Sequence, residues 1–335
     1  MNFVSFGEIL LRLSPVNYSR FVQAESFGAV YGGSEANVAV SLACFGVNTS
    51  FVTKLPANEI GQAAVNSLRK HGINTSGIIR GGSRIGLYYL EKGASQRPSK
   101  VIYDRAGSAI AAADPSEFDW KNILLGADWF HFSGITPALS KSAEKCCLAA
   151  CRAAKDAGLK ISCDLNYRES LWSYEDARMS MEKLMPFADL CIINKEHASS
   201  VFGLNIPDNA NTDPYKESAR LVSEKFGIGS VALTLRESAS ASVNGWAGLL
   251  YTEKNYFLSE EYNVHIVDRV GAGDALAAGL IYSFLNGARP QDAIEFAVAA
   301  SCLKHSVEGD ANLVSADEVN KLVRGGNKSV GLIQR

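Results

Sequence analysis

The sequence lacks the features that mark membrane proteins and nucleic-acid-binding proteins. Its 33 Lys and Arg residues nearly balance 35 Asp and Glu residues, so the formal net charge of the 335 residues is −2. A chain so close to neutrality is not a strongly basic nucleic-acid-binding protein, although local basic sites for acidic ligands stay compatible with it. The longest apolar stretch, near 275–285, contains Ser283 and is well short of the roughly 20 residues that a membrane span needs.

Metal-site and disulfide spacings are also missing. The seven cysteines form no Cys-x-x-Cys pair, and the five histidines show no spacing of a known metal motif. Cys147 and Cys151 lie four residues apart in an Ala-rich segment, where small buried side chains of a helix are expected. Residues 1–8 have no basic region and reach Glu8 too early for a signal peptide. We therefore expect no metal-ligand residues, reduced thiols and a cytoplasmic location.

Strand and helix patterns alternate through most of the chain. Strands are predicted over 3–6, 49–54, 129–132, 160–165, 190–193 and 230–235, and helices over 38–44, 141–157, 174–187, 215–226 and 275–286. This alternation predicts an α/β fold whose central sheet is mostly parallel and carries helices on both faces. No internal repeat or low-complexity linker divides the sequence, so we expect one continuous domain over 1–335.

Two short β-type segments, 86–91 and 100–103, break this alternation because no helix separates them. They indicate either a plain edge hairpin or a small β appendage that closes over a site as a lid. We favour a lid built from segments within about 10–35 and 84–106. A projecting sheet leaves strand edges unpaired, and two copies can hide them across a twofold axis. The lid therefore predicts a homodimer or a higher homo-oligomer.

The strongest chemical motif is DRVGAGD over 268–274, directly before a predicted helix. Gly271, Ala272 and Gly273 at a helix start let backbone N–H groups converge on an anion, which the positive helix end also favours. Asp274 beside an anion site is suited to accept a proton from a hydroxyl that attacks a phosphoryl group. Helix capping and a dinucleotide turn are the alternatives, but a dinucleotide turn belongs in an early βαβ unit. The absence of any Gly-Lys dipeptide excludes a P-loop.

A second glycine motif, GGSEANVA over 32–39, opens the helix predicted near the N-terminus. Its glycines permit close approach of the backbone to a ligand, and Asn37 offers a donor and an acceptor to a polyol. Together the two motifs resemble the ribokinase and phosphofructokinase-B family of carbohydrate kinases, over essentially the whole chain. The resemblance implies a ribokinase-like fold, sugar contacts at Gly33 and Asn37, anion-hole amides from Gly271 to Gly273, and Asp274 as the general base.

Two positions depart from the family pattern. Val270 stands where the family usually has a threonine, which removes a hydroxyl before the glycine turn. The family motif Asn-x-x-Glu, linked to magnesium and phosphate positioning, reads Asn194-Lys195-Glu196-His197 here, so the glutamate comes one place early. The resemblance implies ATP and Mg²⁺, with a monovalent cation such as K⁺ as a further candidate.

Two further segments suggest an acidic sugar. YDRAGSA over 103–109 lies in the proposed lid, and DLNYR over 164–168 ends a predicted parallel strand at its carboxyl end, where such sheets bind ligands. An arginine fork fits a carboxylate, and a neutral sugar has no anion to bind it. Surface ion pairing is the alternative for each arginine taken singly.

These segments, with KHSVEGD over 304–310, look like those of 2-keto-3-deoxygluconate kinases. The resemblance implies that Tyr88, Tyr103, Arg105 and Arg168 hold the keto-acid end, and that Asp310 lies near the substrate hydroxyls. The expected reaction is ATP-dependent phosphorylation of the terminal hydroxyl to the 6-phosphate. A fructokinase or ribokinase type of the same family, or a silent sugar-binding protein, is the alternative.

The nucleotide-binding residues are harder to predict from the sequence, because adenine pockets are mostly apolar. The family places phosphate and ribose contacts at the end of the strand predicted over 230–235, which implies Thr234 and Arg236. The usual glycine just afterwards is replaced by Glu237-Ser238. Asn166 and Asn194 complete the nucleotide contacts that the resemblance implies. The expected partners are a sugar acid, ATP and a second copy of the chain, with no nucleic acid or membrane.

Overall fold

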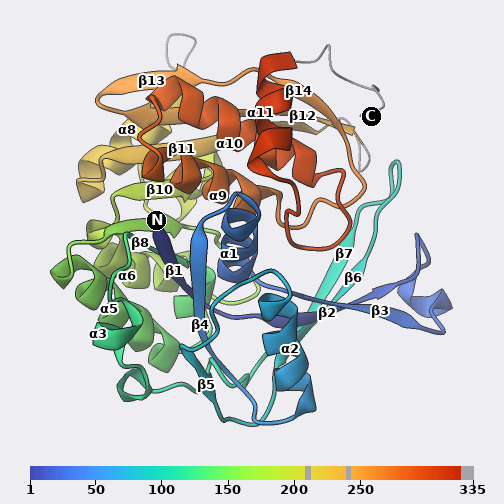
Figure 1. The fold of residues 1–335 in the computed structure, drawn as a ribbon. Helices are drawn as coiled ribbons and strands as arrows, with labels where there is room; N and C mark the ends of the chain where they lie inside the picture. Colours follow the sequence, from blue (N-terminus) through green and yellow to red (C-terminus); the bar gives the residue numbers. More distant parts are fainter. Residues whose placement is uncertain (208–212, 239–242, 326–335) are drawn as a thin grey trace.

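A ten-stranded sheet forms the centre of the computed structural model, which describes residues 1–207, 213–238 and 243–325 (Figure 1). Its strands are β1 (Asn2–Phe6), β4 (Asn48–Leu55), β5 (Ile78–Arg80), β8 (Trp129–Ser133), β9 (Lys160–Asp164), β10 (Leu190–Ile193), β11 (Ser230–Ser238), β12 (Val243–Thr252), β13 (Asn255–Leu258) and β14 (Tyr262–His265). The order is β13-β12-β11-β10-β9-β8-β1-β4-β5, with β14 also on β12. Pairing is parallel from β11 to β5, which confirms the predicted mostly parallel sheet, whereas β12, β13 and β14 add an antiparallel edge.

Helices cover both faces of this sheet. One face carries α1 (Ser34–Cys44), α2 (Glu59–Arg69), α9 (Ala272–Leu285), α10 (Pro290–Lys304) and α11 (Ala316–Gly325). The other carries α3 (Trp120–Ile123), α5 (Lys141–Asp156), α6 (Tyr174–Leu184), α7 (Lys195–Ser200) and α8 (Pro214–Phe226), while the short α4 (Ile135–Ala138) follows β8. Neighbouring strand residues enter opposite cores, as Phe3 and Val4 do, because side chains alternate across a strand.

The core between the main sheet and helices α3, α5, α6, α7 and α8 contains a group of cysteines. Cys147 and Cys151 on α5 are fully buried, as predicted, and Cys163 on β9 is paired in register with Cys191 on β10. Burial raises the pKa of all four thiols, which keeps them protonated and unreactive. Within 1–207, 213–238 and 243–325, no helix is long and apolar enough to cross a membrane, and no cluster of three or more His, Cys, Asp and Glu residues could hold a metal ion.

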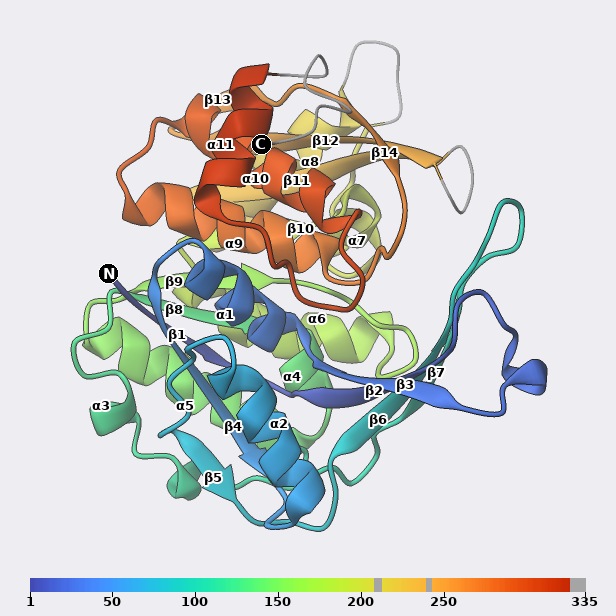
Figure 2. The same ribbon diagram turned by 45° about the vertical axis from the view of Figure 1, so that its right-hand side comes forward.

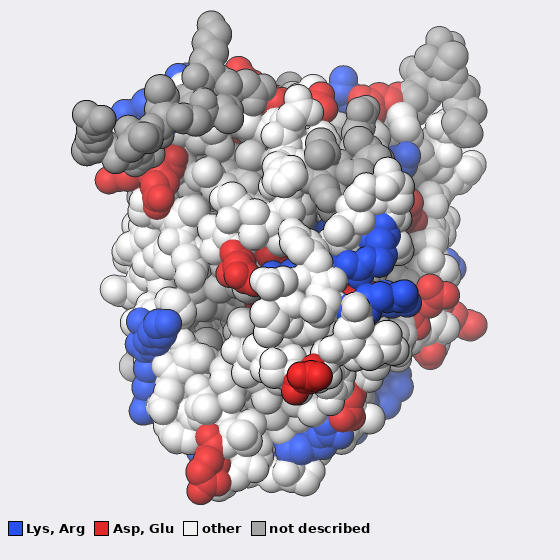
Figure 3. Space-filling model, turned by 90° about the vertical axis from the view of Figure 1, so that its right-hand side faces the viewer, with Lys and Arg blue, Asp and Glu red and all other residues white. Residues whose placement is uncertain are grey.

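A separate four-stranded sheet projects from the body (Figure 2). Its strands, in the order β3-β2-β6-β7, are β3 (Phe27–Gly32), β2 (Leu10–Pro15), β6 (Gly86–Glu91) and β7 (Lys100–Asp104). The strand pair at 86–91 and 100–104 thus belongs to this small sheet and is no edge hairpin of the main one. Lys, Arg, Asp and Glu are scattered among uncharged residues on the side from which it projects (Figure 3).

Candidate active site

A cavity of about 510 Å³ lies between the small sheet and the carboxyl ends of β9, β10 and β11. Its volume is in the range of small-molecule sites. The cavity brings together nearly all of the residues predicted from the sequence: Gly33, Asn37, Tyr88, Tyr103, Arg105, Asn166, Arg168, Asn194, Thr234, Gly271, Ala272, Gly273, Asp274 and Asp310. The exception is Arg236, which lies in β11 opposite Trp246 and whose side chain falls outside the described part of the chain.

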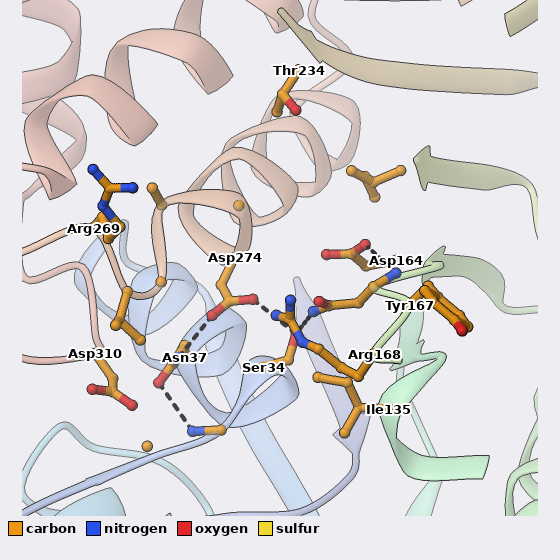
Figure 4. Close-up of a pocket in the computed structure, with 18 of the residues that line it drawn as sticks. Ser34, Asn37, Ile135, Asp164, Tyr167, Arg168, Thr234, Arg269, Asp274 and Asp310 are labelled. Atoms are coloured by element: carbon orange, nitrogen blue, oxygen red, sulfur yellow. Dashed lines mark hydrogen bonds between the residues drawn. The ribbon is translucent and has the colours of Figure 1, made fainter. Parts of the chain in front are cut away.

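Asp274 lies in the first turn of α9 and points into the cavity (Figure 4). Its Oδ1 accepts a hydrogen bond from Ser34 Oγ at 2.8 Å, and its Oδ2 accepts one from Asn37 Nδ2 at 2.7 Å. Burial raises the pKa of Asp274, while these two bonds and the charge of Arg168 oppose the rise. Each carboxylate oxygen still has a free acceptor site. The carboxylate is therefore fixed in orientation and able to accept a proton from a substrate hydroxyl.

Asn37 and Asn166 are placed to orient this carboxylate. Asn37 donates to Asp274, and its own Oδ1 accepts from Gly33 N at 3.3 Å. Asn166, which has a positive φ of 37°, donates from Nδ2 to Ser34 Oγ at 3.0 Å, and Ser34 donates onward to Asp274. The sequence analysis missed Ser34, although a hydroxyl that directly follows the glycine pair was visible there.

The glycine turn before α9 shows why glycine is needed. Gly271 caps the helix with φ of 82°, and a Cβ on it would lie 1.8 Å from the carbonyl oxygen of Asp310. A Cβ on Gly273 would meet nothing within 4 Å, so the backbone there faces open space beside the cavity. The open backbone and the positive end of α9 form a fitting cradle for a phosphate group. Val270 packs instead against Leu10 and Leu90 of the small sheet.

The two predicted carboxylate-binding arginines differ sharply. Arg105 is buried, and its Nε and Nη2 both donate to Oε2 of buried Glu8, the first at 2.8 Å. Arg168 is exposed within the cavity, and no acidic oxygen of the described residues lies within 4.0 Å of its guanidinium nitrogens. The charge of Arg105 is thus already balanced by a residue that the sequence analysis missed. Arg168 therefore offers its charge to an anionic ligand.

Tyr88 and Asp310 are bound to each other. Tyr88 Oη donates to Asp310 Oδ2, and Arg12 Nη1 donates to the other oxygen at 2.7 Å. Arg12 Nη2 also donates to Asp268 Oδ2 at 2.7 Å, so one buried guanidinium joins β2 to two late loops. Burial and the charge of Asp310 raise the pKa of Tyr88, which therefore stays a neutral donor. Arg12 was not among the predicted site residues, because its two partners lie 256 and 298 residues away in the sequence.

A second buried carboxyl group lies near Asp274. Asp164 ends β9, lines the cavity and accepts from the backbone N–H of Asn166 at 3.0 Å. Burial, followed by the charge of Asp274, raises the pKa of Asp164 to about 7, against the opposing charge of Arg168. The DLNYR segment was singled out in the sequence, but the proximity of Asp164 to Asp274 depends on the tertiary fold.

Comparisons with known proteins agree with this geometry. The model of the pfkB family of carbohydrate kinases matches residues 2–317. The chain belongs to this family. It is 32% identical over 327 residues to a 2-dehydro-3-deoxygalactonokinase of Haloferax volcanii, with 98% of each chain covered. It is 28% identical over 329 residues to a 2-dehydro-3-deoxygluconokinase of Thermoproteus tenax, covering 97% of this chain and 94% of the relative.

Solved structures give the same picture. A crystal structure of a 2-dehydro-3-deoxygluconokinase of Thermotoga maritima superposes with a TM-score of 0.94 at 49% identity, covering 97% of this chain and 100% of the other. Ribokinase-like structures at lower identity share the fold. The protein is therefore a carbohydrate kinase with a ribokinase-like fold, as the two glycine motifs indicated.

In this pfkB kinase the predicted nucleotide contacts also converge. Asn194 precedes α7, and its Oδ1 accepts from Thr234 Oγ1 at 3.3 Å across the ends of β10 and β11. Glu196, which comes one place early in the motif, lines the same cavity with a side chain that is 71% exposed. The carboxyl ends of these strands therefore present the amide of Asn194, the hydroxyl of Thr234 and the accessible carboxylate of Glu196.

Proposed function

We propose that this carbohydrate kinase phosphorylates the terminal hydroxyl of 2-keto-3-deoxygluconate with ATP, giving the 6-phosphate. The observation that carries the proposal is the exposed guanidinium of Arg168, which has no carboxylate oxygen of the described residues within 4.0 Å and lies in the cavity that also holds Asp274. A sugar acid supplies the carboxylate that a guanidinium fork fits, whereas fructose and ribose do not. Two relatives named for kinases of 2-dehydro-3-deoxy sugar acids, and the structure with the TM-score of 0.94, support the assignment.

The arrangement suggests a simple course for the reaction. Asp274 accepts the proton of the attacking hydroxyl while Ser34 and Asn37 hold its two oxygens in place. The N–H groups of the turn at Gly271–Gly273, aided by the positive end of α9, stabilise the negative charge on the phosphoryl group in transfer. Tyr103 and Arg105 approach the sugar from the small sheet, which excludes water when it closes.

The described residues fit ATP and Mg²⁺. Gly273 leaves room at the helix start for a phosphate, and Thr234 and Asn194 border the same space. Mg²⁺ in kinases is bound mainly through substrate phosphates and water, so it would need no cage of protein ligands here. Asn194 and Glu196 are the residues that would hold its water shell. When bound, the ion neutralises charge that develops on the phosphates.

A panel of substrates tests the proposal. ADP release is measured with 2-keto-3-deoxygluconate, its galactonate counterpart, fructose and ribose. We expect the two sugar acids to have a kcat/KM far above that of the neutral sugars. The galactonate counterpart is included because of the Haloferax relative. Much faster turnover of fructose or ribose would instead establish the fructokinase or ribokinase type, and sugar binding without ADP release would establish a silent binding protein.

A further inference from the structure

Lys304 is the last residue of α10 and is completely buried, with 0% of its surface exposed. Its ammonium group donates to the carbonyl oxygen of Val307 at 2.9 Å and to that of Asp268 at 3.3 Å. No carboxylate oxygen of the described residues lies within 4.0 Å of Nζ, so peptide carbonyls are its recorded partners. Burying a charge costs several kcal/mol unless its surroundings compensate for the lost water. The surroundings of this ammonium group therefore indicate what it does.

The two carbonyl groups belong to the loops beneath the phosphate-binding turn. Asp268 begins the DRVGAGD segment, and Val307 lies in the loop that follows α10. Lys304 Cε lies only 3.4 Å from the point where a Cβ on Gly271 would stand. The ammonium group therefore joins the two loops directly below the residue that caps α9.

Three acids and one further cation act on this ammonium group. Asp268 and Asp310 oppose the effect of burial, which lowers the pKa of Lys304, and Asp274 does so to a smaller extent. Arg12 repels the ammonium but is itself paired with both Asp268 and Asp310. Arg12 and Lys304 together thus balance Asp268 and Asp310, and the buried group is neutral when Lys304 is protonated.

We propose that the Lys304 ammonium is a built-in monovalent cation, which holds the loops under the phosphate-binding turn, so that the kinase needs no dissolved potassium or ammonium ion. Carbonyl oxygens are the groups that replace water around a potassium ion, and the lysine ammonium is a compact charge of the same sign and magnitude. Because the ammonium group is covalently part of the chain, it stays between the carbonyl groups of Asp268 and Val307 whatever salt is in solution. This inference rests on the proposed kinase reaction and argues against the monovalent cation that the family resemblance offered as a further candidate.

Lys304 does not touch the cavity, so it is a positioning residue. It acts through the turn, whose N–H groups must already point at the phosphoryl group when charge develops there. Loss of the ammonium should therefore lower kcat and leave the KM of the sugar nearly unchanged. A merely structural role would lower stability without this separation of kcat from KM.

The test compares the wild-type kinase with Lys304→Met and Lys304→Gln, which keep much of the side-chain volume without the charge. Lys183→Met on α6 is the matched control, because its ammonium pairs with Glu144 at 2.8 Å on the opposite face of the main sheet. Turnover is measured in choline chloride and in potassium or ammonium chloride at an equal ionic strength of about 0.1 M, so that screening is constant. Melting temperatures are recorded in the same salts, since they report cation binding without any substrate.

We expect the wild-type kcat and melting temperature to be the same in choline and in potassium. Lys304→Met should lose about 10²-fold in kcat in choline and regain part of it in potassium or ammonium, with a potassium-specific rise in melting temperature. Potassium activation of the wild type, or full activity of both Lys304 variants in choline, would overturn the inference, and the wild-type result stands even if the variants do not fold. Failure of the proposed reaction looks different: the wild type then phosphorylates no sugar acid in any salt, while its melting temperature still reports whether potassium binds.

Discussion

The two sheets of this kinase are held in place by different interactions. Every residue of β8 and β10 in the main sheet is buried, and helices pack on both faces of that sheet. In the small sheet every residue of β7 is exposed, Leu10, Tyr88 and Leu90 form a small buried apolar group with Val270, and Leu11, Tyr31 and Leu87 are partly buried against the core of the body. Apolar burial therefore stabilises the main sheet, while the small sheet has little of it.

Charged groups join the small sheet to the body instead. Arg12 on β2 pairs with Asp268 and Asp310, and Arg105 after β7 pairs with Glu8. Such buried pairs contribute little net stability, but removal of one partner is costly. Apolar burial thus fixes the main sheet and its helices, whereas the position of the small sheet depends on buried ion pairs with the body.

The largest effect is expected at the chemical centre on the main sheet. Asp274→Asn should keep the binding of sugar acid and ATP but lower kcat by about 10²–10⁴-fold, because a general base contributes that much. Asp292→Asn is the matched control, since Asp292 lies in the first turn of the neighbouring helix α10 and is exposed. Steady-state kinetics and calorimetric binding measure the two quantities. A near-normal kcat for Asp274→Asn would refute its role as the base.

The second prediction compares the two arginines. Arg168→Ala should lower the ratio of kcat/KM for the sugar acid over a neutral sugar by about 10²-fold, because the carboxylate loses its charged partner in a closing site. Arg168→Lys should restore only part of it, since a point charge cannot reproduce the two-pronged geometry. An unchanged ratio in Arg168→Ala would remove the main support for a sugar acid.

Arg105→Ala should affect stability more than specificity. It leaves buried Glu8 without its partner, which costs about 3–5 kcal/mol of the free energy of unfolding. The double variant Arg105→Ala with Glu8→Gln should recover much of that loss, because the uncompensated charge is gone. Denaturant unfolding measures the stability, and the substrate panel measures the ratio. If Arg105→Ala changes the ratio as much as Arg168→Ala does, the two arginines act as one clamp and the contrast between them is wrong.

A smaller effect is expected in the acid limb of the pH profile, which is the fall of kcat/KM as the pH decreases. Asp274 must be ionised to accept a proton, and burial raises its pKa above the ordinary 3.8. As the pH decreases, activity should therefore fall at a higher pH than it would with an aspartate of ordinary pKa. The charge of Asp274 helps to raise the pKa of Asp164 to about 7, so Asp164 is already protonated where Asp274 titrates, and Asp164→Asn should leave this limb in place, as exposed Asp176→Asn on α6 should. A limb that moves to lower pH in Asp164→Asn would show that Asp164 is still ionised where Asp274 titrates.

Sequence patterns predicted those parts of the site that depend on local structure. The turn before α9 needs glycine for its positive φ at Gly271, and the seven consecutive residues 268–274 are enough to predict such a turn. The pairing of Arg105 with Glu8 could not be predicted in this way, because 97 residues separate them and neither segment alone shows which charges are neutralised. The antiparallel edge of β12, β13 and β14 was missed for a similar reason, since the alternation of strand and helix stops before it.

The smallest effect on catalysis is expected on the outer face of the small sheet. Val101 and Tyr103 on β7 line the cavity, and Ile102 between them points to the other side, where it is 55% exposed and opposite Tyr89. Phe27 at the other edge contacts Tyr89 with ring centroids 6.1 Å apart, so Ile102, Tyr89 and Phe27 form an apolar row on the outer face. A second copy of the sheet is the surface that we expect to cover it.

Ile102→Asp should therefore convert a dimer, or a multiple of one, into a monomer while kcat changes least among all these variants. Ile60→Asp is the matched control, because Ile60 on α2 is 45% exposed and lies away from the small sheet. Light scattering at micromolar concentration measures the mass, and ADP release measures the activity of the same samples. A fully active wild-type monomer would contradict the predicted assembly. A dimer that persists in Ile102→Asp would place the interface elsewhere. The outer face of the small sheet would then not be the contact between copies.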